Sequence, residues 1–237
     1  MRALFERPFA MSRLLAIDTS TEACSVALLD GERLVESYFE APREHVQRLL
    51  PMIDALLAQH DIALRELDAI AFGRGPGAFT GLRICLSVVQ GLAFGAELPV
   101  IPVSTLAALA QTAVTDALPA GSLLCSAIDA RMDEVYCNWY RLGADRLVTA
   151  VGDERVCAPE NVADVVVADA LRIGIGSGWR YAERIPLCDM ATIDATLLPR
   201  ASAVARLAVP LWNSGAVALP EEAVPTYLRN DVAWAKS

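Results

Sequence analysis

Two aspartates with similar surroundings are the first candidates for chemistry. Asp18 ends the apolar run LLAI, and Asp129 ends the similar run CSAI. Carboxylates are preferred ligands of Mg²⁺, so a pair that faced one cleft could hold the ion beside a nucleotide phosphate. Alternatively, each side chain hydrogen-bonds to the turn that follows its own strand. The residue types leave both interpretations open.

A glycine-rich segment, GRGPGAFTG at 73–81, lies between a predicted strand and a predicted helix. Backbone N–H groups at such a place could bind an anion. However, Pro76 has no N–H, and no acidic residue ends the next predicted strand, so the match to a dinucleotide fingerprint is poor. We favour a tight structural loop that brings strand and helix together. Its key positions are Gly75, Pro76, Gly77 and Gly81, and GIGSG at 174–178 allows the same two interpretations.

Several classes of active site are excluded by residue counts. His45 and His60 are the only histidines, and on one helix they would lie about 22 Å apart, too far to bind one metal ion. The only lysine is Lys236, which excludes a Walker P-loop and an internal Schiff base. No G-x-S-x-G or C-x-x-C occurs, so we predict no metal site and no nucleophilic hydrolase. The six cysteines (24, 85, 125, 137, 157 and 188) are expected to be reduced thiols, mostly buried.

Charge and hydropathy limit the surroundings in which the chain works. The formal net charge is −9, whereas proteins that grip nucleic acid cluster Lys and Arg on their surface. Charged residues interrupt the N-terminal sequence MRALFERPFAMSR, which is unlike a secretory signal, and Met11 is a second plausible start. The uncharged stretch at 98–115 contains two prolines and several polar residues, which disqualifies it as a membrane span. We therefore expect a cytoplasmic protein that contacts RNA only indirectly.

The elements around the two aspartates repeat. A shift of 111 residues places Asp18 on Asp129 and the predicted strand at 24–28 on 135–139. Each copy begins with a strand and a hairpin, the first at 14–19, 24–29 and 33–39, and continues with alternating strands and helices. This pattern predicts an α/β fold of two lobes, each with a mixed sheet, that divide near 118–121. Both aspartates would lie at the ends of first strands, where α/β proteins bind ligands.

Two amphipathic helices are predicted between the copies. The segment 43–60 has apolar residues at helical spacing, with Pro51 expected to kink or restart the helix, and a second helix is expected at 82–94. Their apolar content exceeds what packing on one sheet requires, which predicts a partner surface, with complete burial as the alternative. Other predicted elements are strands at 67–72, 100–103, 165–168 and 172–175, a helix capped by Ser104 running toward 117, and a helix at 201–211.

Five segments together resemble the TsaB (YeaZ) family. They are LLAIDTSTEACSVAL (14–28), HVQRLLPMIDALL (45–57), GPGAFTGLRI (75–84), AIDARMDEVY (127–136) and PTYLR (225–229). The resemblance implies the smaller, Gcp-like subunit in bacterial synthesis of the tRNA modification threonylcarbamoyladenosine (t6A). It also implies a two-lobed actin-like, Hsp70-like (ASKHA) fold, in agreement with the duplication. In this family the subunit is a non-catalytic scaffold that binds the catalytic paralogue TsaD as a heterodimer, is joined by the ATPase TsaE, and forms a homodimer in isolation.

The resemblance also implies roles for particular residues. The motif from Asp18 to Thr21, with Asp129, matches the phosphate motifs of the actin-like superfamily. Ser20 stands where nucleotide-binding members have glycine, and its side chain would crowd a phosphate. We therefore expect a vestigial phosphate motif made of Asp18, Thr19, Ser20, Thr21 and Asp129. The partner surface would comprise His45, Leu49, Leu50, Ile53, Leu57, Thr80, Leu82, Arg83, Ile84, Ser87 and Gln90.

The resulting prediction is a 1–12 extension, an N-terminal lobe at 13–117 that carries the partner-binding helices, and a C-terminal lobe at 118–237 whose tail packs back on the first. No cofactor is required by the chain itself, with ATP or ADP and Mg²⁺ expected only at an interface of the complex. Ala78 and Cys85 depart from the usual Ser and Gly of the family. The alternatives are an ATP-binding and ATP-hydrolysing enzyme of the actin-like superfamily and, ranked last, a glycoprotease-like peptidase.

Overall fold

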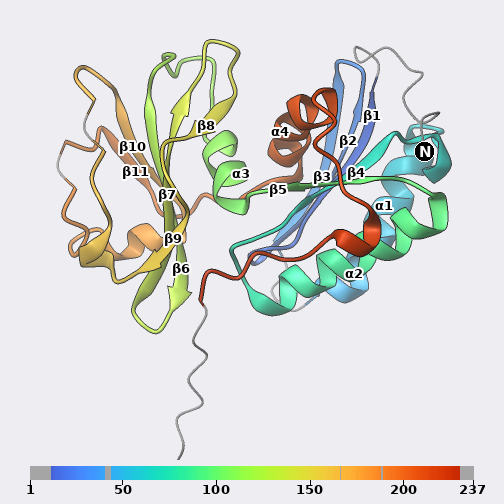
Figure 1. The fold of residues 1–237 in the computed structure, drawn as a ribbon, viewed down its shortest axis with the longest axis horizontal. Helices are drawn as coiled ribbons and strands as arrows, with labels where there is room; N and C mark the ends of the chain where they lie inside the picture. The colour runs from blue at the N-terminus through green and yellow to red at the C-terminus, as the bar shows by residue number, and fades with distance from the viewer. Residues whose placement is uncertain (1–11, 41–43, 166, 188, 230–237) are drawn as a thin grey trace, which may run out of the picture.

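The computed structural model describes residues 12–40, 44–165, 167–187 and 189–229, and it contains two mixed sheets side by side (Figure 1). The first sheet has the order β3-β2-β1-β4-β5, and the second has the order β11-β10-β6-β7-β8, with β9 paired to β7. The strands of the first are β1 (Arg13–Asp18), β2 (Ala23–Asp30), β3 (Arg33–Glu40), β4 (Ala69–Gly73) and β5 (Val100–Val103). Those of the second are β6 (Leu123–Arg131), β7 (Glu134–Leu142), β8 (Val148–Ala150), β9 (Arg155–Cys157), β10 (Arg172–Ile175) and β11 (Thr192–Asp194).

The two sheets have the same connectivity. β1 pairs antiparallel with β2 and parallel with β4, and β6 pairs antiparallel with β7 and parallel with β10. The shift of 111 residues seen in the sequence therefore superimposes first strand on first strand and hairpin on hairpin. The two-lobed α/β prediction with mixed sheets is confirmed.

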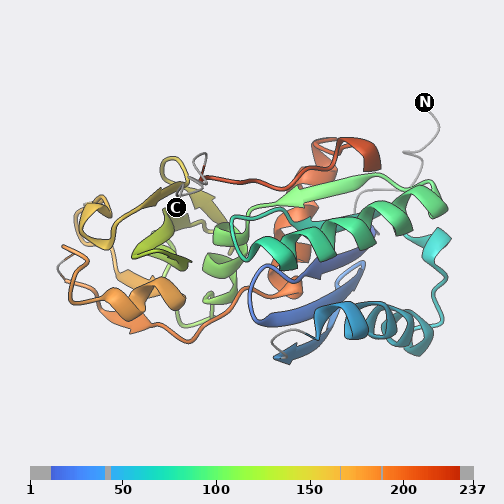
Figure 2. The ribbon, with the colours of Figure 1, turned by 90° about the horizontal axis from the view of Figure 1, so that it is seen from below.

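Helices fill the space between the sheets and cover the outer face of the first. α1 (His45–Gln59) and α2 (Phe79–Ala96) lie on one face of the first sheet, and α4 (Ala201–Asn213) lies on the other (Figures 1 and 2). α3 (Thr105–Thr112) packs on the second sheet and against α4. Short 3₁₀ turns complete the fold: η2 (Leu64–Glu66), η3 (Pro159–Asn161), η4 (Ser177–Tyr181) and η5 (Pro220–Glu222).

Strand β1 shows why the first sheet is buried on both faces. Leu14 and Ala16 belong to the core cluster shared with α3 and α4, whereas Leu15 and Ile17 belong to the cluster under α1 and α2. Successive strand residues point to opposite faces, so a continuous apolar run fits a strand between two layers of helices. The central layer of α3 and α4 is therefore the joint between the lobes.

Several sequence predictions of single elements are wrong or incomplete. α1 continues through Pro51 as one helix, so no restart occurs there. α2 begins at Phe79 and ends at Ala96, and α3 ends at Thr112 without reaching 117. No strand forms at 165–168, as far as that segment is described, because Val165 and Val167 instead cover the core of the second sheet. Residues 1–11 of the predicted extension lie outside the described part.

α2 is the one helix in the described ranges that is long and apolar enough, by length and composition alone, to cross a bilayer. In the fold, one stripe of this helix, with Leu82, Cys85, Val89 and Ala93, is buried in the core under the first sheet. Core helices of folded domains commonly pass the same test. Packing on the sheet therefore explains the apolar residues on one side of α2. It does not explain those on the outward side.

Candidate functional site

Asp18 is fully buried at the end of β1. Its Oδ1 accepts hydrogen bonds from the Ser20 backbone N–H (3.0 Å) and from Ser20 Oγ (2.7 Å). Its Oδ2 has no hydrogen-bond partner among the described residues. Burial raises the pKa of Asp18 from 3.8 to about 6, and the two hydrogen bonds from Ser20 offset part of that effect. One of the two carboxyl oxygens is thus bonded within the first lobe.

The glycine-rich loop packs directly against the segment from Asp18 to Ser20. A Cβ at Gly73 would lie 2.0 Å from Asp18 Oδ2, one at Gly77 would lie 2.4 Å from Ser20 O, and one at Gly81 would lie 2.0 Å from Thr19 O. At Gly77 and Gly81 the neighbouring atom is a backbone carbonyl oxygen, so only glycine permits the approach, whereas at Gly73 it is the Asp18 carboxylate. The structure therefore supports the interpretation of 73–81 as a close structural contact.

Three backbone donors of this loop are occupied. The Arg74 N–H donates to Val103 O (2.8 Å), the Gly75 N–H donates to Thr105 Oγ1 (3.1 Å), and the Ala78 N–H donates to Ser20 O (2.7 Å). An anion that used these three N–H groups would have to displace these bonds. Gly75 also has φ +102°, a conformation that favours glycine.

Asp129 is held within the second lobe, at the end of β6. Its Oδ2 pairs with Arg180 Nη1 (2.8 Å) and Arg131 Nη1 (3.4 Å), and its Oδ1 accepts from the Arg131 backbone N–H (3.0 Å). The Asp129 backbone N–H in turn donates to Ser177 Oγ (3.1 Å). Each aspartate thus has partners in its own lobe, and the described residues contain no group of three His, Cys, Asp or Glu side chains that could hold a metal ion.

The described cysteines form no disulfide, and Cys188 lies outside the described residues. Cys137 Sγ and Cys157 Sγ are 3.8 Å apart on neighbouring strands β7 and β9. Burial raises the pKa of Cys24 to about 11, so its thiol stays protonated at neutral pH.

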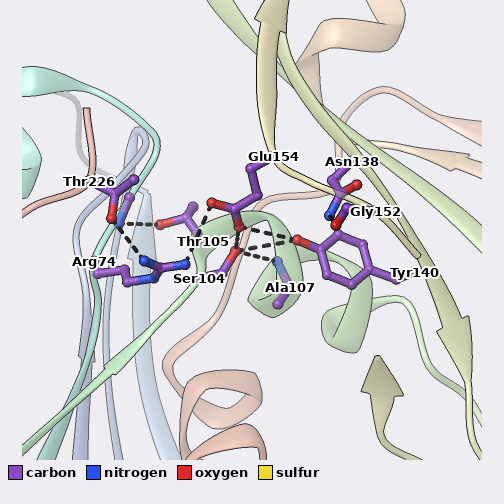
Figure 3. Close-up of polar contacts among 10 residues, drawn as sticks. Arg74, Ser104, Thr105, Ala107, Asn138, Tyr140, Gly152, Glu154 and Thr226 are labelled. Atoms are coloured by element: carbon purple, nitrogen blue, oxygen red, sulfur yellow. Dashed lines mark hydrogen bonds and ion pairs between the residues drawn. The ribbon is translucent and has the colours of Figure 1, made fainter. Parts of the chain in front are cut away.

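A polar network joins the two lobes beside the glycine loop (Figure 3). Glu154 accepts hydrogen bonds from Ser104 Oγ and from the Tyr140 hydroxyl (3.3 Å to the latter), and its Oε2 lies 3.7 Å from Arg74 Nη2. Arg74 Nη1 also donates to Thr226 Oγ1 (3.1 Å). The network therefore connects the loop after β4, the start of α3, the second lobe and the C-terminal tail.

The predicted partner residues of α1 divide into two groups. His45, Leu49, Ile53 and Leu57 are buried, and the three leucine and isoleucine side chains belong to the core of the first lobe. The helical periodicity identified the face that packs on the sheet, so the expectation that these four contact a partner is corrected. Of the predicted partner residues of α1, Leu50 faces outward, with 45% of its surface exposed. Val46, which is not among them, is 68% exposed.

The predicted residues of α2 also differ in exposure. Thr80, Arg83 and Ser87 are exposed, Ile84 and Gln90 are half-buried, and Leu82 is buried and therefore does not face a partner. Two aromatic residues that the sequence analysis missed, Phe79 and Phe94, are 54% and 77% exposed on this helix. The signal was available, because both lie off the buried stripe at helical spacing.

The C-terminal tail runs beside α2 (Figure 2). Gln90 Nε2 donates to Pro220 O (3.2 Å) and Ala223 O (3.1 Å), so this predicted partner residue is occupied by the tail. Ala218 forms a β-bridge with Val100. Further along the tail, the centres of the Tyr227 and Phe79 rings lie 5.4 Å apart. The Arg83 guanidinium carbon lies 3.9 Å from the centre of the Phe79 ring. The tail thus extends the apolar outward face of α2.

Comparisons with known proteins agree with this architecture. A family model described as TsaD, tRNA N6-adenosine threonylcarbamoyltransferase, matches residues 39–233. The chain is 41% identical over 233 residues to the tRNA threonylcarbamoyladenosine biosynthesis protein TsaB of Haemophilus influenzae, covering 94% of this chain and 96% of that protein. The TsaB protein of Escherichia coli is also 41% identical, over 228 residues, with 94% and 97% covered. The chain belongs to the TsaB (YeaZ) family.

A solved structure extends the family assignment to the fold. YeaZ from Pseudomonas aeruginosa is 50% identical and superimposes with a TM-score of 0.87, covering 92% of this chain and all of that one. The two-lobed, actin-like fold expected for the TsaB family is therefore confirmed. Within that fold, the Asp18–Ser20 segment and the glycine loop are packed against each other, whereas the outward faces of α1 and α2 carry exposed apolar side chains.

Proposed function

We propose that this chain acts in tRNA threonylcarbamoyladenosine biosynthesis as a non-catalytic scaffold in the cytoplasm. It binds the catalytic subunit TsaD through the outward faces of α1 and α2, and the complex recruits TsaE. In isolation the same surface pairs two copies of the chain. We call this the two-helix surface, and its members are Val46, Leu50, Phe79, Ser87, Gly91, Phe94 and Gly95. Contact with tRNA is left mainly to the partners, because the chain carries a net charge of −9.

The observation that carries the proposal is the position of two helical glycines. A Cβ at Gly91 or Gly95 would meet nothing within 4 Å, so the fold of this chain does not require glycine at either position. Glycine inside a helix costs about 1 kcal/mol relative to alanine. Ser87, Gly91 and Gly95 are spaced four residues apart and exposed, which lets the backbone of a partner helix come close.

Exposed apolar side chains occur on the same two helices. Phe94 is 77% exposed, Val46 68%, Phe79 54% and Leu50 45%. Apolar residues around a flat strip of glycine suit a packed helix-to-helix contact. Phe79 and Tyr227 add aromatic area where the tail passes α2, and aromatic residues are enriched in the centres of protein interfaces.

The non-catalytic part of the proposal is supported by the packing of Asp18 against the glycine loop. Three amide donors of the glycine loop are bound to protein acceptors, and Asp18 lies against Gly73 without exposure. A phosphate bound through these three amides would have to break contacts that the fold already makes. The alternative of an ATP-hydrolysing enzyme would require Mg²⁺-dependent ATP binding by the isolated chain that Asp129→Ala abolishes.

The test is sedimentation velocity of the full chain, alone and mixed with its cognate TsaD, for the wild type and for Leu50→Glu with Phe94→Glu. We expect the double variant to lose both the homodimer and the TsaD complex, because two carboxylates would be buried without partners. The matched control is Ile193→Glu, at a 44% exposed position of β11 in the second lobe. A TsaD complex that forms equally well with the double variant would rule out this surface. Addition of TsaE with ATP then tests recruitment.

A further inference from the structure

A cavity of about 480 Å³ opens in the central layer, where the end of α3, the turn between β7 and β8, and the first turns of α4 meet. Three arginines line it, Arg146, Arg200 and Arg206, against one carboxylate, that of Asp116. This concentration of positive charge lies on a chain of net charge −9. Neither the two-helix surface nor the phosphate motif contributes a residue to it.

Arg146 is held in place by neutral groups. Its Nη1 donates to Leu118 O (2.6 Å) and its Nη2 to Thr115 O. Gln111 Nε2 donates to Arg146 O (2.9 Å), which fixes the backbone of the turn as well. Carbonyl oxygens orient the guanidinium but do not cancel its charge, so the charge remains available to the cavity.

Arg200 is fixed in a different way. Its guanidinium lies 4.1 Å from the centre of the Tyr38 ring, and its Nη1 lies 3.1 Å from Glu36 Oε2. Glu36 Oε1 also accepts a hydrogen bond from the Ser202 backbone N–H (2.8 Å) in the first turn of α4. One carboxylate is thus shared between a guanidinium and a helix terminus, and it neutralises Arg200 only in part.

Arg206 lies on α4 and is exposed, and in the described part of the chain it makes no hydrogen bond or ion pair. It therefore adds an uncompensated charge beside two guanidinium groups that are already oriented. Groups fixed before a ligand arrives lose little freedom when it binds. Two fixed arginines and one free arginine are an arrangement suited to a multiply charged anion.

We propose that this cavity binds a small phosphate compound with several negative charges, of the class of inorganic triphosphate or the phosphates of a nucleotide. Guanidinium groups bind phosphate oxygens through paired N–H donors. Three guanidinium charges are better neutralised by an anion with several negative charges than by a single carboxylate. The volume is within the range of small-molecule sites. None of the residues that line the cavity is aromatic, so recognition rests on the phosphates and not on a base.

The experiment is isothermal titration calorimetry of the full chain with inorganic triphosphate, at low and at physiological salt. We expect binding that weakens at least tenfold in Arg206→Glu. Arg65→Glu is the matched control, because Arg65 is also exposed, makes no described hydrogen bond or ion pair, and lies on η2, away from the cavity lining. ATP should compete with triphosphate, and adenosine should not.

Three outcomes would overturn the proposal. The first is no binding of millimolar triphosphate at low salt by the wild-type chain. The second is equal weakening in Arg206→Glu and Arg65→Glu, which would indicate attraction to overall charge. The third is binding of tRNA that depends on Arg206 while triphosphate fails to compete, which would indicate a nucleic-acid surface. Arg206→Glu is expected to bind TsaD normally, so failure here is distinguishable from failure of the scaffold proposal.

Discussion

The two ends of helix α2 use glycine for opposite reasons. At Gly81, in the first turn, a Cβ would lie 2.0 Å from Thr19 O, so the fold of this chain demands glycine there. At Gly91, ten residues further on, a Cβ would meet nothing within 4 Å. The first glycine is explained by contacts inside the molecule. The second has a cost in helix stability and no benefit inside the molecule, which directs attention to something outside it.

The same contrast, between contacts made inside the chain and exposed groups, separates the residues around Asp18, the glycine loop and Asp129 from the two-helix surface. Asp18 Oδ1, three amides of the glycine loop and the Asp129 carboxylate are bonded within the chain, so these groups have structural contacts. On the two-helix surface, four apolar side chains keep between 45% and 77% of their surface exposed, those of Val46, Leu50, Phe79 and Phe94.

The largest effect is expected at the tight end of α2. Gly81→Ala forces a methyl group against Thr19 O, so we expect the free energy of unfolding to fall by about 3 kcal/mol or more. Urea denaturation followed by circular dichroism measures it. A stability close to that of the wild type would show that the loop can shift away from residues 18–20, and the structural explanation of the loop would then be wrong.

Asp18 should make stability depend on pH. Its pKa is raised from 3.8 to about 6 in the folded chain, so the folded state binds more protons than the unfolded state between these values. Ionisation of Asp18 in the folded chain therefore costs about 3 kcal/mol, so the free energy of unfolding falls by about this amount as pH rises through the range from 4 to 6. Asp18→Asn should remove that slope.

The measurement for Asp18 is the free energy of unfolding of both proteins from pH 4 to pH 7. The difference between Asp18→Asn and the wild type should grow with pH in favour of the variant. Ser20→Ala sharpens the test, because loss of the Oγ hydrogen bond, at 2.7 Å, should raise the pKa of Asp18 further and move the slope to higher pH. A pH-independent difference would contradict the burial of an ionisable group at this position.

A smaller effect is expected from the network that joins the lobes. Glu154→Ala removes the carboxylate oxygen that accepts from both the Ser104 and the Tyr140 hydroxyls. These two hydroxyls lie 3.3 Å apart and can still bond to each other, so one donor is left unpaired, which should cost about 1–3 kcal/mol. Tyr140→Phe is the matched control, since it removes a hydroxyl together with its need for a partner. Thermal unfolding gives the stability, and small-angle scattering reports whether the lobes open. Equal stability of Glu154→Ala and the wild type would show that the network does not hold the lobes together.

The sequence was sufficient for the architecture because the duplication carries the topology. The shift of 111 residues placed the first strand and hairpin of both lobes, and Ser104 was correctly identified as the cap of α3, where its Oγ accepts from the Ala107 N–H. Failures occurred where long-range packing decides. The apolar run at 165–168 has the composition of a strand, yet it serves as a cover for the second core.

The candidate site was harder to predict than the fold. Helical periodicity marks the face that is buried, so it selected Leu49 and Ile53, and the exposed Phe94 could be found only by its position off that face. The role of Gly81 depends on Thr19, and the cavity depends on Arg146 and Arg206, pairs that are far apart in sequence. Such contacts follow from the folded topology and not from local pattern.

The smallest change in stability, and the most informative one, is expected from Gly91→Ala. Alanine should stabilise the isolated chain by up to about 1 kcal/mol, because it favours the helix and meets no atom. If a partner helix packs on this stripe, the added methyl group is an overpacking change worth about 1.4 kcal/mol, or about a tenfold loss of TsaD affinity. Urea denaturation and sedimentation measure the two quantities on one variant. Higher stability together with unchanged TsaD affinity would leave the glycine unexplained and would move the partner contact away from the outward face of α2.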